Sequence, residues 1–163
     1  AIVELTGPEG VRRLPIREFY IKAGKVDLRP AELQTAILLP RDSYEGYFGH
    51  YIKYAMRNAM DIATLGCSVN VKLSEDKQRI EDARIAYGVA GPIPIRAVAA
   101  EEQIRGKELS PEQVSAFSKA VLADINPRDS WRASKAFREH ISQVLAKRAL
   151  TEAIHRAGGE IHE

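Results

Sequence analysis

The feature that most constrains the fold of this chain is a change of hydrophobic period near its middle. Apolar residues fill every second position from Leu65 to Leu73, and a second alternating run spans Ile80 to Tyr87. This period of two is typical of strands with one buried face. With Tyr51 to Ala55, these runs predict a three-stranded antiparallel sheet. After Pro94 the spacing becomes helical, and strands followed by helices favour an α+β fold with a helical layer on one face of the sheet.

The helical part carries start and stop signals. A short helix is expected from Arg96 to Arg105. The Ser-Pro-Glu-Gln motif at 110–113 offers a capping serine, a proline at the first helical position and a glutamine that closes a capping box. The last helix starts at Ser130 or Ser134, runs for about 25 residues and ends at Gly158.

The first 41 residues form a separate region. Ile2 to Leu5 is expected as a strand, with Val11 to Ile16 returning as its hairpin partner after a turn rich in glycine and proline. Phe19 to Lys25 is expected as a loop, and Glu32 to Leu39 as a further strand. The chain opens on a strand without an initiator methionine, so we expect it to be part of a longer protein. We therefore place domains at 1–41 and 42–163.

Composition excludes several classes of protein. The chain has 163 residues, 45% of them hydrophobic and 28% charged, which is ordinary for a globular domain. A net charge of +2 is too small to indicate nucleic acid or an anionic membrane as a partner. No apolar run approaches the ~20 residues of a membrane helix. A single cysteine, Cys67, excludes a disulfide framework and an iron–sulfur cluster held by this chain alone. The expected compartment is the cytoplasm.

Familiar catalytic and metal-binding patterns are missing from the sequence. Nucleophile-elbow, zinc-protease and Cys-x-x-Cys motifs are absent, as is a glycine-rich phosphate loop before a helix. A surface or structural role is favoured for the four histidines, His50, His140, His155 and His162, which lack metal-ligand spacing. Cys67 lies on the apolar side of its strand and is expected to be buried and inert. We therefore expect no catalytic and no metal-binding residues here.

One charged segment has two interpretations. Lys53, Arg57 and Asp61 are spaced by four between two strands. Spacing alone favours a surface turn with a solvated ion pair, worth at most ~1 kcal/mol. The alternative is a charged loop that approaches a bound ligand, with Lys53 near an anionic or electron-rich ring.

Longer stretches carry a family resemblance. The segments KYAMRNAMDIATLG, RIAYGVAGPIPIRAVAAEE, VLADINPRDSWRASKAFREH and VLAKRALTEAI occur in this order. Together they resemble the FAD-binding, or medium, subunit of xanthine dehydrogenases and other molybdenum hydroxylases. Residues 1–41 resemble the last strands of that family's FAD-binding domain. The rest resembles its C-terminal domain, the CO dehydrogenase flavoprotein C-terminal-like domain.

This resemblance implies an electron-transfer role within an oxidoreductase complex. Such a subunit takes electrons from 2Fe-2S clusters and passes them through FAD to NAD or oxygen. The clusters and the molybdopterin belong to partner subunits. FAD is held mainly by glycine-rich loops of an N-terminal part that this sequence lacks, so the chain alone is expected to be inactive.

The resemblance also implies which residues approach the flavin. Lys53 matches a lysine near the isoalloxazine, and Leu33 and Gln34 match residues lining the flavin pocket. Arg57 and Asp61 belong to a charged segment close to the redox-active face. An alternative from another class remains open, in which the chain is a cofactor-free module that docks partner subunits.

Overall fold

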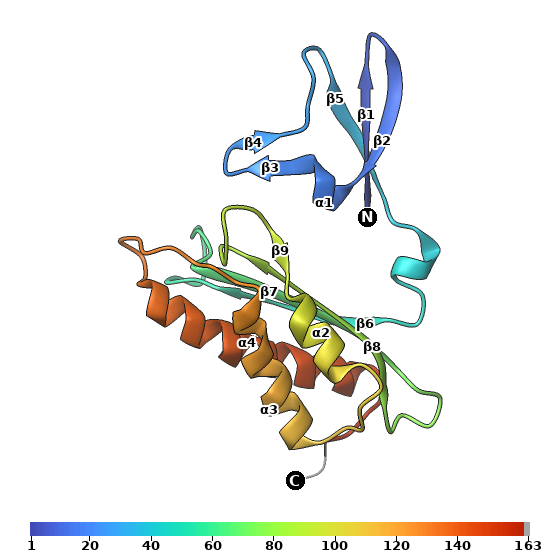
Figure 1. Ribbon diagram of the computed structural model, residues 1–163, viewed down its shortest axis with the longest axis vertical. Helices are drawn as coiled ribbons and strands as arrows, with labels where there is room; N and C mark the ends of the chain where they lie inside the picture. The colour runs from blue at the N-terminus through green and yellow to red at the C-terminus, as the bar shows by residue number, and fades with distance from the viewer. Residues whose placement is uncertain (162–163) are drawn as a thin grey trace. The chain divides into compact units, whose positions relative to one another are not determined.

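The chain folds into two compact units, Ala1–Glu45 and Gly46–Glu163, in a computed structural model (Figure 1). The structure describes residues 1–161, so His162 of the sequence analysis lies outside the described part. Within residues 1–161, no helix is both long enough and apolar enough to cross a membrane. Each unit has its own sheet and its own core, and each is described by itself below.

The first unit is mostly strand. Its elements are β1 (Ile2–Gly7), β2 (Gly10–Pro15), α1 (Ile16–Phe19), β3 (Tyr20–Lys22), β4 (Lys25–Val26), β5 (Leu33–Leu38) and the 3-10 turn η1 (Arg41–Ser43). A three-stranded antiparallel sheet has the order β2-β1-β5, and the β1–β2 hairpin has the partners expected from the sequence. The segment predicted as a loop at Phe19 to Lys25 instead holds the β3–β4 hairpin. Strands of three and two residues are too short to show a period in the sequence.

The first unit buries little apolar surface. Its core cluster consists of Val3, Leu5 and Phe19. Beside it, the Arg12 guanidinium donates to Glu32 Oε1 at 2.7 Å and to Asp27 Oδ2 at 2.9 Å. The hydrogen bonds from Arg12 lower the pKa of Glu32 to about 2. This ion-pair cluster therefore ties β2 to the segment before β5.

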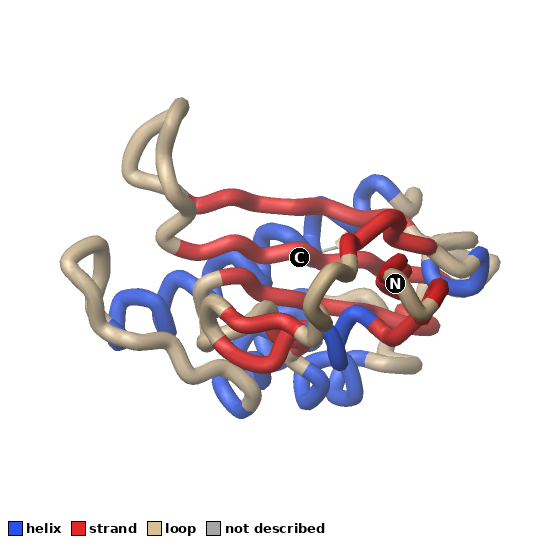
Figure 2. Tube along the Cα trace, turned by 90° about the horizontal axis from the view of Figure 1, so that it is seen from above, coloured by secondary structure: helices blue, strands red, loops and turns tan. Residues whose placement is uncertain are grey.

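The second unit is a sheet backed by helices. Its elements are β6 (Phe48–Tyr54), β7 (Leu65–Leu73), β8 (Ile80–Gly88), β9 (Ile95–Arg96), α2 (Val98–Ile104), α3 (Pro111–Ala120), the 3-10 turn η2 (Val121–Ala123) and α4 (Lys135–Arg156). The strands are antiparallel in the order β6-β7-β8-β9. Seen from above, the long strands lie side by side in one layer with helices behind them (Figure 2). The α+β class with helices on an antiparallel sheet agrees with the sequence pattern.

The number of strands in this sheet differs from the prediction. We predicted three strands, and the structure has a fourth, β9, which pairs with β8 through Ala86 and Tyr87. β9 has only two residues and follows a turn containing two prolines, so it leaves no alternating pattern to detect. Its pairing depends on the chain folding back along β8, which is a tertiary effect.

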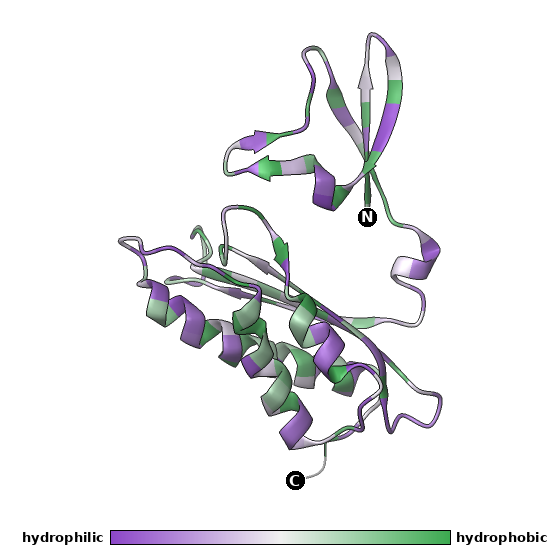
Figure 3. Ribbon diagram, in the orientation of Figure 1, coloured by the Kyte–Doolittle hydropathy of each residue, from purple (hydrophilic) through white to green (hydrophobic). Residues whose placement is uncertain are grey.

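The helices begin where the capping residues indicate. Ser110 Oγ accepts the backbone N–H of Gln113, and Ser134 Oγ accepts that of Phe137. Ser134 is thus the cap of α4, and Ser130 has another role. Both helices alternate hydrophobic and hydrophilic stretches, as helices with one buried face do (Figure 3). Their apolar sides complete a single large core against β7 and β8.

Cys67 lies in the middle of that core. It is fully buried, and burial raises the pKa of its thiol to about 12. The neighbouring Tyr87 is also buried and donates its hydroxyl to the backbone oxygen of Ser142 on α4 at 2.8 Å. The expectation that this thiol is buried is confirmed, and its raised pKa disfavours the reactive thiolate.

Candidate functional site

The charged segment between β6 and β7 is a closed loop. The backbone N–H of Thr64 donates to the carbonyl of Tyr54 at 2.8 Å, which brings the two ends of the loop together. Lys53 lies beside this closure, on β6, opposite Gly66 of β7. Its ammonium group donates to the backbone oxygen of Asp61 at 2.6 Å. Lys53 therefore reaches across the loop while its side chain stays exposed.

Asp61 organises the loop from within. Its carboxylate accepts the backbone N–H groups of Arg57 at 2.9 Å and Ile62 at 2.8 Å, and it pairs with the Arg57 guanidinium at 3.8 Å. Partial burial raises the pKa of Asp61, but the backbone hydrogen bonds and the Arg57 charge outweigh this and lower it. The structure thus brings together the three residues that the sequence singled out. A shallow pocket is lined by Lys53, Ala55, Arg57, Asn58, Ala59 and Asp61.

The loop displays apolar side chains as well as charges. Met60 is 95% exposed and has a positive φ of 49°, while Met56 and Ile62 are also exposed. Arg57 Nη2 donates to the backbone oxygen of Met60 at 2.8 Å, which supports this unusual backbone turn. Large apolar side chains held outward on a tied loop are suited to contact another surface or a flat ligand.

Leu33 and Gln34 belong to the first unit. Both lie on β5, where Leu33 pairs with Thr6 and Gln34 with Leu5 of β1. Leu33 is 71% exposed, and Gln34 is exposed as well. The five candidate residues thus fall into two groups. Leu33 and Gln34 lie on β5 of the first unit, and Lys53, Arg57 and Asp61 lie on β6 and the loop after it in the second unit.

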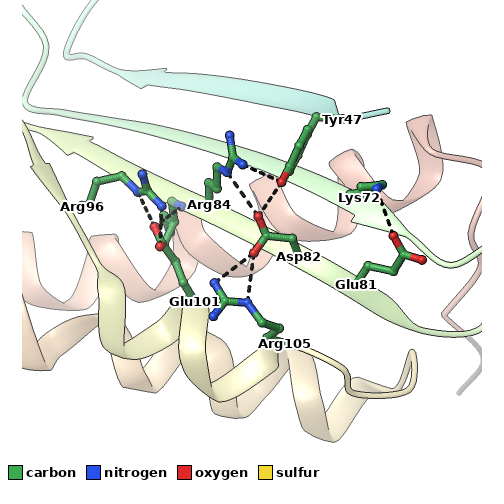
Figure 4. A network of polar contacts seen from close by, with 9 residues as sticks. Tyr47, Lys72, Glu81, Asp82, Arg84, Arg96, Glu101 and Arg105 are labelled. Atoms are coloured by element: carbon green, nitrogen blue, oxygen red, sulfur yellow. Dashed lines mark hydrogen bonds and ion pairs between the residues drawn. The ribbon is translucent and has the colours of Figure 1, made fainter. Parts of the chain in front are cut away.

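A polar network on β8 was missed by the sequence analysis (Figure 4). Asp82 lies at its centre and accepts the Tyr47 hydroxyl at 2.5 Å and the Arg105 Nη2 at 3.0 Å. Arg84 Nη2 donates to the Tyr47 oxygen at 2.6 Å, and its guanidinium stacks 4.2 Å from the Tyr47 ring centre. The only signal in the sequence is that Asp82 and Arg84 occupy the outward positions of an alternating strand.

Two consecutive acidic residues, Glu101 and Glu102, lie in α2. Glu101 is 3% exposed, accepts the backbone N–H of Ile85 at 3.0 Å and pairs with Arg96 on β9. Glu102 is exposed. The two carboxylates thus face different surroundings, and Glu101 fastens α2 to the sheet. Among residues 1–161, no group of three or more histidine, cysteine or acidic side chains is arranged to hold a metal.

Comparison with known proteins identifies the family. Residues 50–153 match the model of the CO dehydrogenase flavoprotein C-terminal domain. The chain belongs to this family. The match begins two residues into β6, includes β7, β8 and β9 and nearly all of α4, and confirms the family resemblance read from the sequence.

Individual relatives extend the match beyond that domain. The chain is 41% identical over 161 residues to the xanthine dehydrogenase FAD-binding subunit of Escherichia coli O157:H7, covering 99% of this chain and 54% of the relative. It is 30% identical to the glyceraldehyde dehydrogenase medium chain of Sulfolobus acidocaldarius, with 93% and 52% covered. The chain thus spans about half the length of the curated relatives it matches.

A solved structure shows the same fold. This is the carbon monoxide dehydrogenase of Hydrogenophaga pseudoflava lacking the Mo-pyranopterin moiety of its molybdenum cofactor, which aligns with a TM-score of 0.82 at 28% identity. The alignment covers 95% of this chain and 53% of that one, so it includes the first unit as well as the second.

Proposed function

We propose that this chain is the C-terminal half of the FAD-binding subunit of a xanthine dehydrogenase-type molybdenum hydroxylase. The subunit passes electrons from 2Fe-2S clusters through FAD to NAD or oxygen, next to a molybdopterin-binding subunit and an iron–sulfur subunit in the cytoplasm. The identity of 41% to a xanthine dehydrogenase FAD-binding subunit carries this proposal. Residues 1–41 are then the last strands of the FAD-binding domain, and residues 42–163 are its C-terminal neighbour.

The residues present suit a flavin. Lys53 offers an exposed ammonium group with protons beyond the one given to Asp61. Leu33 offers an exposed apolar side chain, of the kind that packs against a flat ring. Each unit therefore offers one kind of contact that suits a flavin, a cation in the second unit and an apolar side chain in the first.

Each candidate residue has a distinct task in this proposal. Lys53 contributes positive charge beside the isoalloxazine, and Leu33 and Gln34 line its pocket. Asp61 and Arg57 keep the loop closed, so that Lys53 is held in place before the cofactor binds. When bound, the flavin supplies the redox chemistry by accepting and passing on electrons. No residue of this chain has to transfer a proton, since hydroxylation belongs to the molybdenum subunit.

A visible absorption titration with FAD tests the proposal. The full-length subunit and the present chain are purified, and FAD is added to each. We expect a perturbed, protein-bound flavin spectrum with the full-length subunit and little or none with the chain alone. Lys53→Met in the full-length subunit should weaken FAD binding or shift its spectrum, while Lys72→Met, at a lysine on the same sheet, should not. Absence of bound flavin in the full-length subunit would reject the proposal.

A docking module without a cofactor is the second candidate. Its support is the set of exposed apolar side chains in two connections of the second unit, Met56, Met60 and Ile62 between β6 and β7 and Trp131 before α4. Trp131 is 85% exposed, and Arg132 stacks over its ring at 4.2 Å. Binding of the partner subunits by a full-length protein that binds no flavin would favour this candidate.

A further inference from the structure

An arginine that the sequence analysis passed over lies beneath the candidate flavin loop. Arg138 is in the first turns of α4 and is only 3% exposed. Its Nη1 donates to the backbone oxygen of Thr64 at 2.8 Å and to that of Val89 at 3.4 Å. Its Nη2 donates to Ser130 Oγ at 2.8 Å. One buried guanidinium therefore joins three connecting segments, those between β6 and β7, between β8 and β9, and before α4.

The three segments lie at the same end of the sheet (Figure 1). Thr64 is the residue whose N–H closes the candidate loop onto Tyr54. Arg138 thus donates to the carbonyl of Thr64, the residue at the far end of the loop. The preceding residue of α4, Phe137, packs its ring against that of Tyr54 with 6.1 Å between centroids. Phe137 and Arg138, which are consecutive in α4, therefore contact the two ends of the loop.

Among the described residues, the hydrogen bonds of the buried Arg138 guanidinium include none to a carboxylate. Its three partners in the described chain are uncharged oxygen atoms, and its Nε has no hydrogen-bond partner there. A buried charge without a paired carboxylate is costly, and a buried apolar side chain would avoid that cost. The planar guanidinium carries five donors and can therefore reach oxygen atoms on separate segments at once. The arrangement fits a residue that fixes positions.

We propose that Arg138 is the positioning residue of the candidate flavin loop. It holds Thr64, and through it the closed loop that places Lys53 and Asp61, so that the Lys53 ammonium stays beside the flavin. This rests on the proposed function above. Since a fixed cation favours the more negative, reduced flavin, loss of Arg138 lowers the affinity for reduced relative to oxidised flavin.

The test uses the full-length subunit with FAD bound. Arg138→Gln should lower the relative affinity for reduced flavin about tenfold, which is a fall of about 30 mV in the two-electron midpoint potential. Arg138→Lys keeps the charge but reaches fewer carbonyls, so its potential should lie between those of wild type and Arg138→Gln. Arg156→Gln is the matched control, because Arg156 is also on α4 and donates to a carbonyl of β6, that of Gly49, at 3.0 Å. It should leave the potential unchanged.

A double variant tests whether Arg138 affects the flavin potential through Lys53. If Arg138 acts by placing Lys53, then Lys53→Met with Arg138→Gln should have the potential of Lys53→Met alone. Additive shifts would overturn the proposal. So would a folded, flavin-bound Arg138→Gln with the wild-type potential.

A second readout does not need the flavin. Trypsin cuts after exposed arginines, and Arg57 is such a residue within the loop. Arg138→Gln should speed the cut after Arg57 at least several-fold relative to wild type and Arg156→Gln. If wild-type protein binds no flavin, the proposed function fails, while faster cleavage still supports loop positioning. Unchanged cleavage would overturn it. Failure of both Arg138 variants to fold, with Arg156→Gln folded, would assign Arg138 a purely structural role and also overturn it.

Discussion

The two units of this chain are stabilised in different ways. The second has one large core built by β7, β8 and the helices, whereas the core cluster of the first consists of three residues. The first unit compensates with the ion-pair cluster of Arg12, Asp27 and Glu32. Burial of apolar surface depends little on pH, whereas ion pairs depend on pH and are screened by salt. The units should therefore respond to different perturbations.

The largest effect is expected from the core of the second unit. Phe117 of α3 is fully buried. Phe117→Ala should lower the free energy of unfolding of this unit by about 3–5 kcal/mol, because it removes apolar contacts and leaves a cavity. Hydrogen exchange of the β7 and β8 amides, measured as urea is added, reports the loss of unfolding free energy. Phe48→Ala is the control, since Phe48 is 44% exposed, and a comparable loss there would contradict the comparison.

The next effect should be confined to the first unit. Arg12→Gln removes the shared partner of Asp27 and Glu32 and should lower the midpoint of unfolding of the first unit without changing that of the second. Hydrogen exchange resolved by peptide distinguishes the two. Arg13→Gln breaks the more exposed pair with Glu4 and should have a smaller effect. Equal effects of the two variants would argue against the importance of the Arg12 cluster.

Acid should also act first on the first unit. The pKa of Glu32 is lowered from an ordinary 4.5 to about 2 by its hydrogen bonds with Arg12. A lowered pKa in the folded state means that this stabilisation is complete above pH 4.5 and is lost as the pH falls towards 2. Thermal unfolding of β1, β2 and β5 between these pH values measures it. In Glu32→Gln the first unit should be less stable at pH 7, and its stability should depend less on pH. An unchanged pH dependence would show that Glu32 does not cause the acid sensitivity.

The smallest expected effect is a gain in the second unit. Val89 has a positive φ of 69°, which a β-branched residue adopts only with strain. Val89→Gly should stabilise the unit by about 1 kcal/mol, because glycine adopts this conformation freely. Val98→Gly, at the exposed first residue of α2, relieves no such strain and should not stabilise the unit. A loss of stability in Val89→Gly would show that the contacts of the valine side chain contribute more stability than the backbone strain costs.

Local sequence signals predicted the second unit better than the first. The long strands β7 and β8 and the capped helices α3 and α4 carry their own period and start signals, so they were found with nearly the observed bounds. β3, β4 and β9 have two or three residues each, which is too few to show an alternating period. No local pattern encodes such strands.

The candidate site was predicted in part for the same reason. The spacing of Lys53, Arg57 and Asp61 indicated a charged loop, and the structure joins them by hydrogen bonds. Arg138 gave no such signal, because its partner Thr64 is 74 residues away. The Tyr47–Asp82 contact spans 35 residues and was equally invisible. Whether the five candidate residues contact FAD stays a prediction.

The buried position of Cys67 makes its rate of alkylation a measure of how often the core of the second unit opens. It is the single cysteine, and it lies in the core of the second unit with its thiol pKa raised to about 12. An alkylating reagent can therefore reach it only when that core opens, and the labelling rate counts those openings. The first unit contributes no thiol and no background. The same seclusion means that air oxidation should leave the folded protein free of covalent dimers.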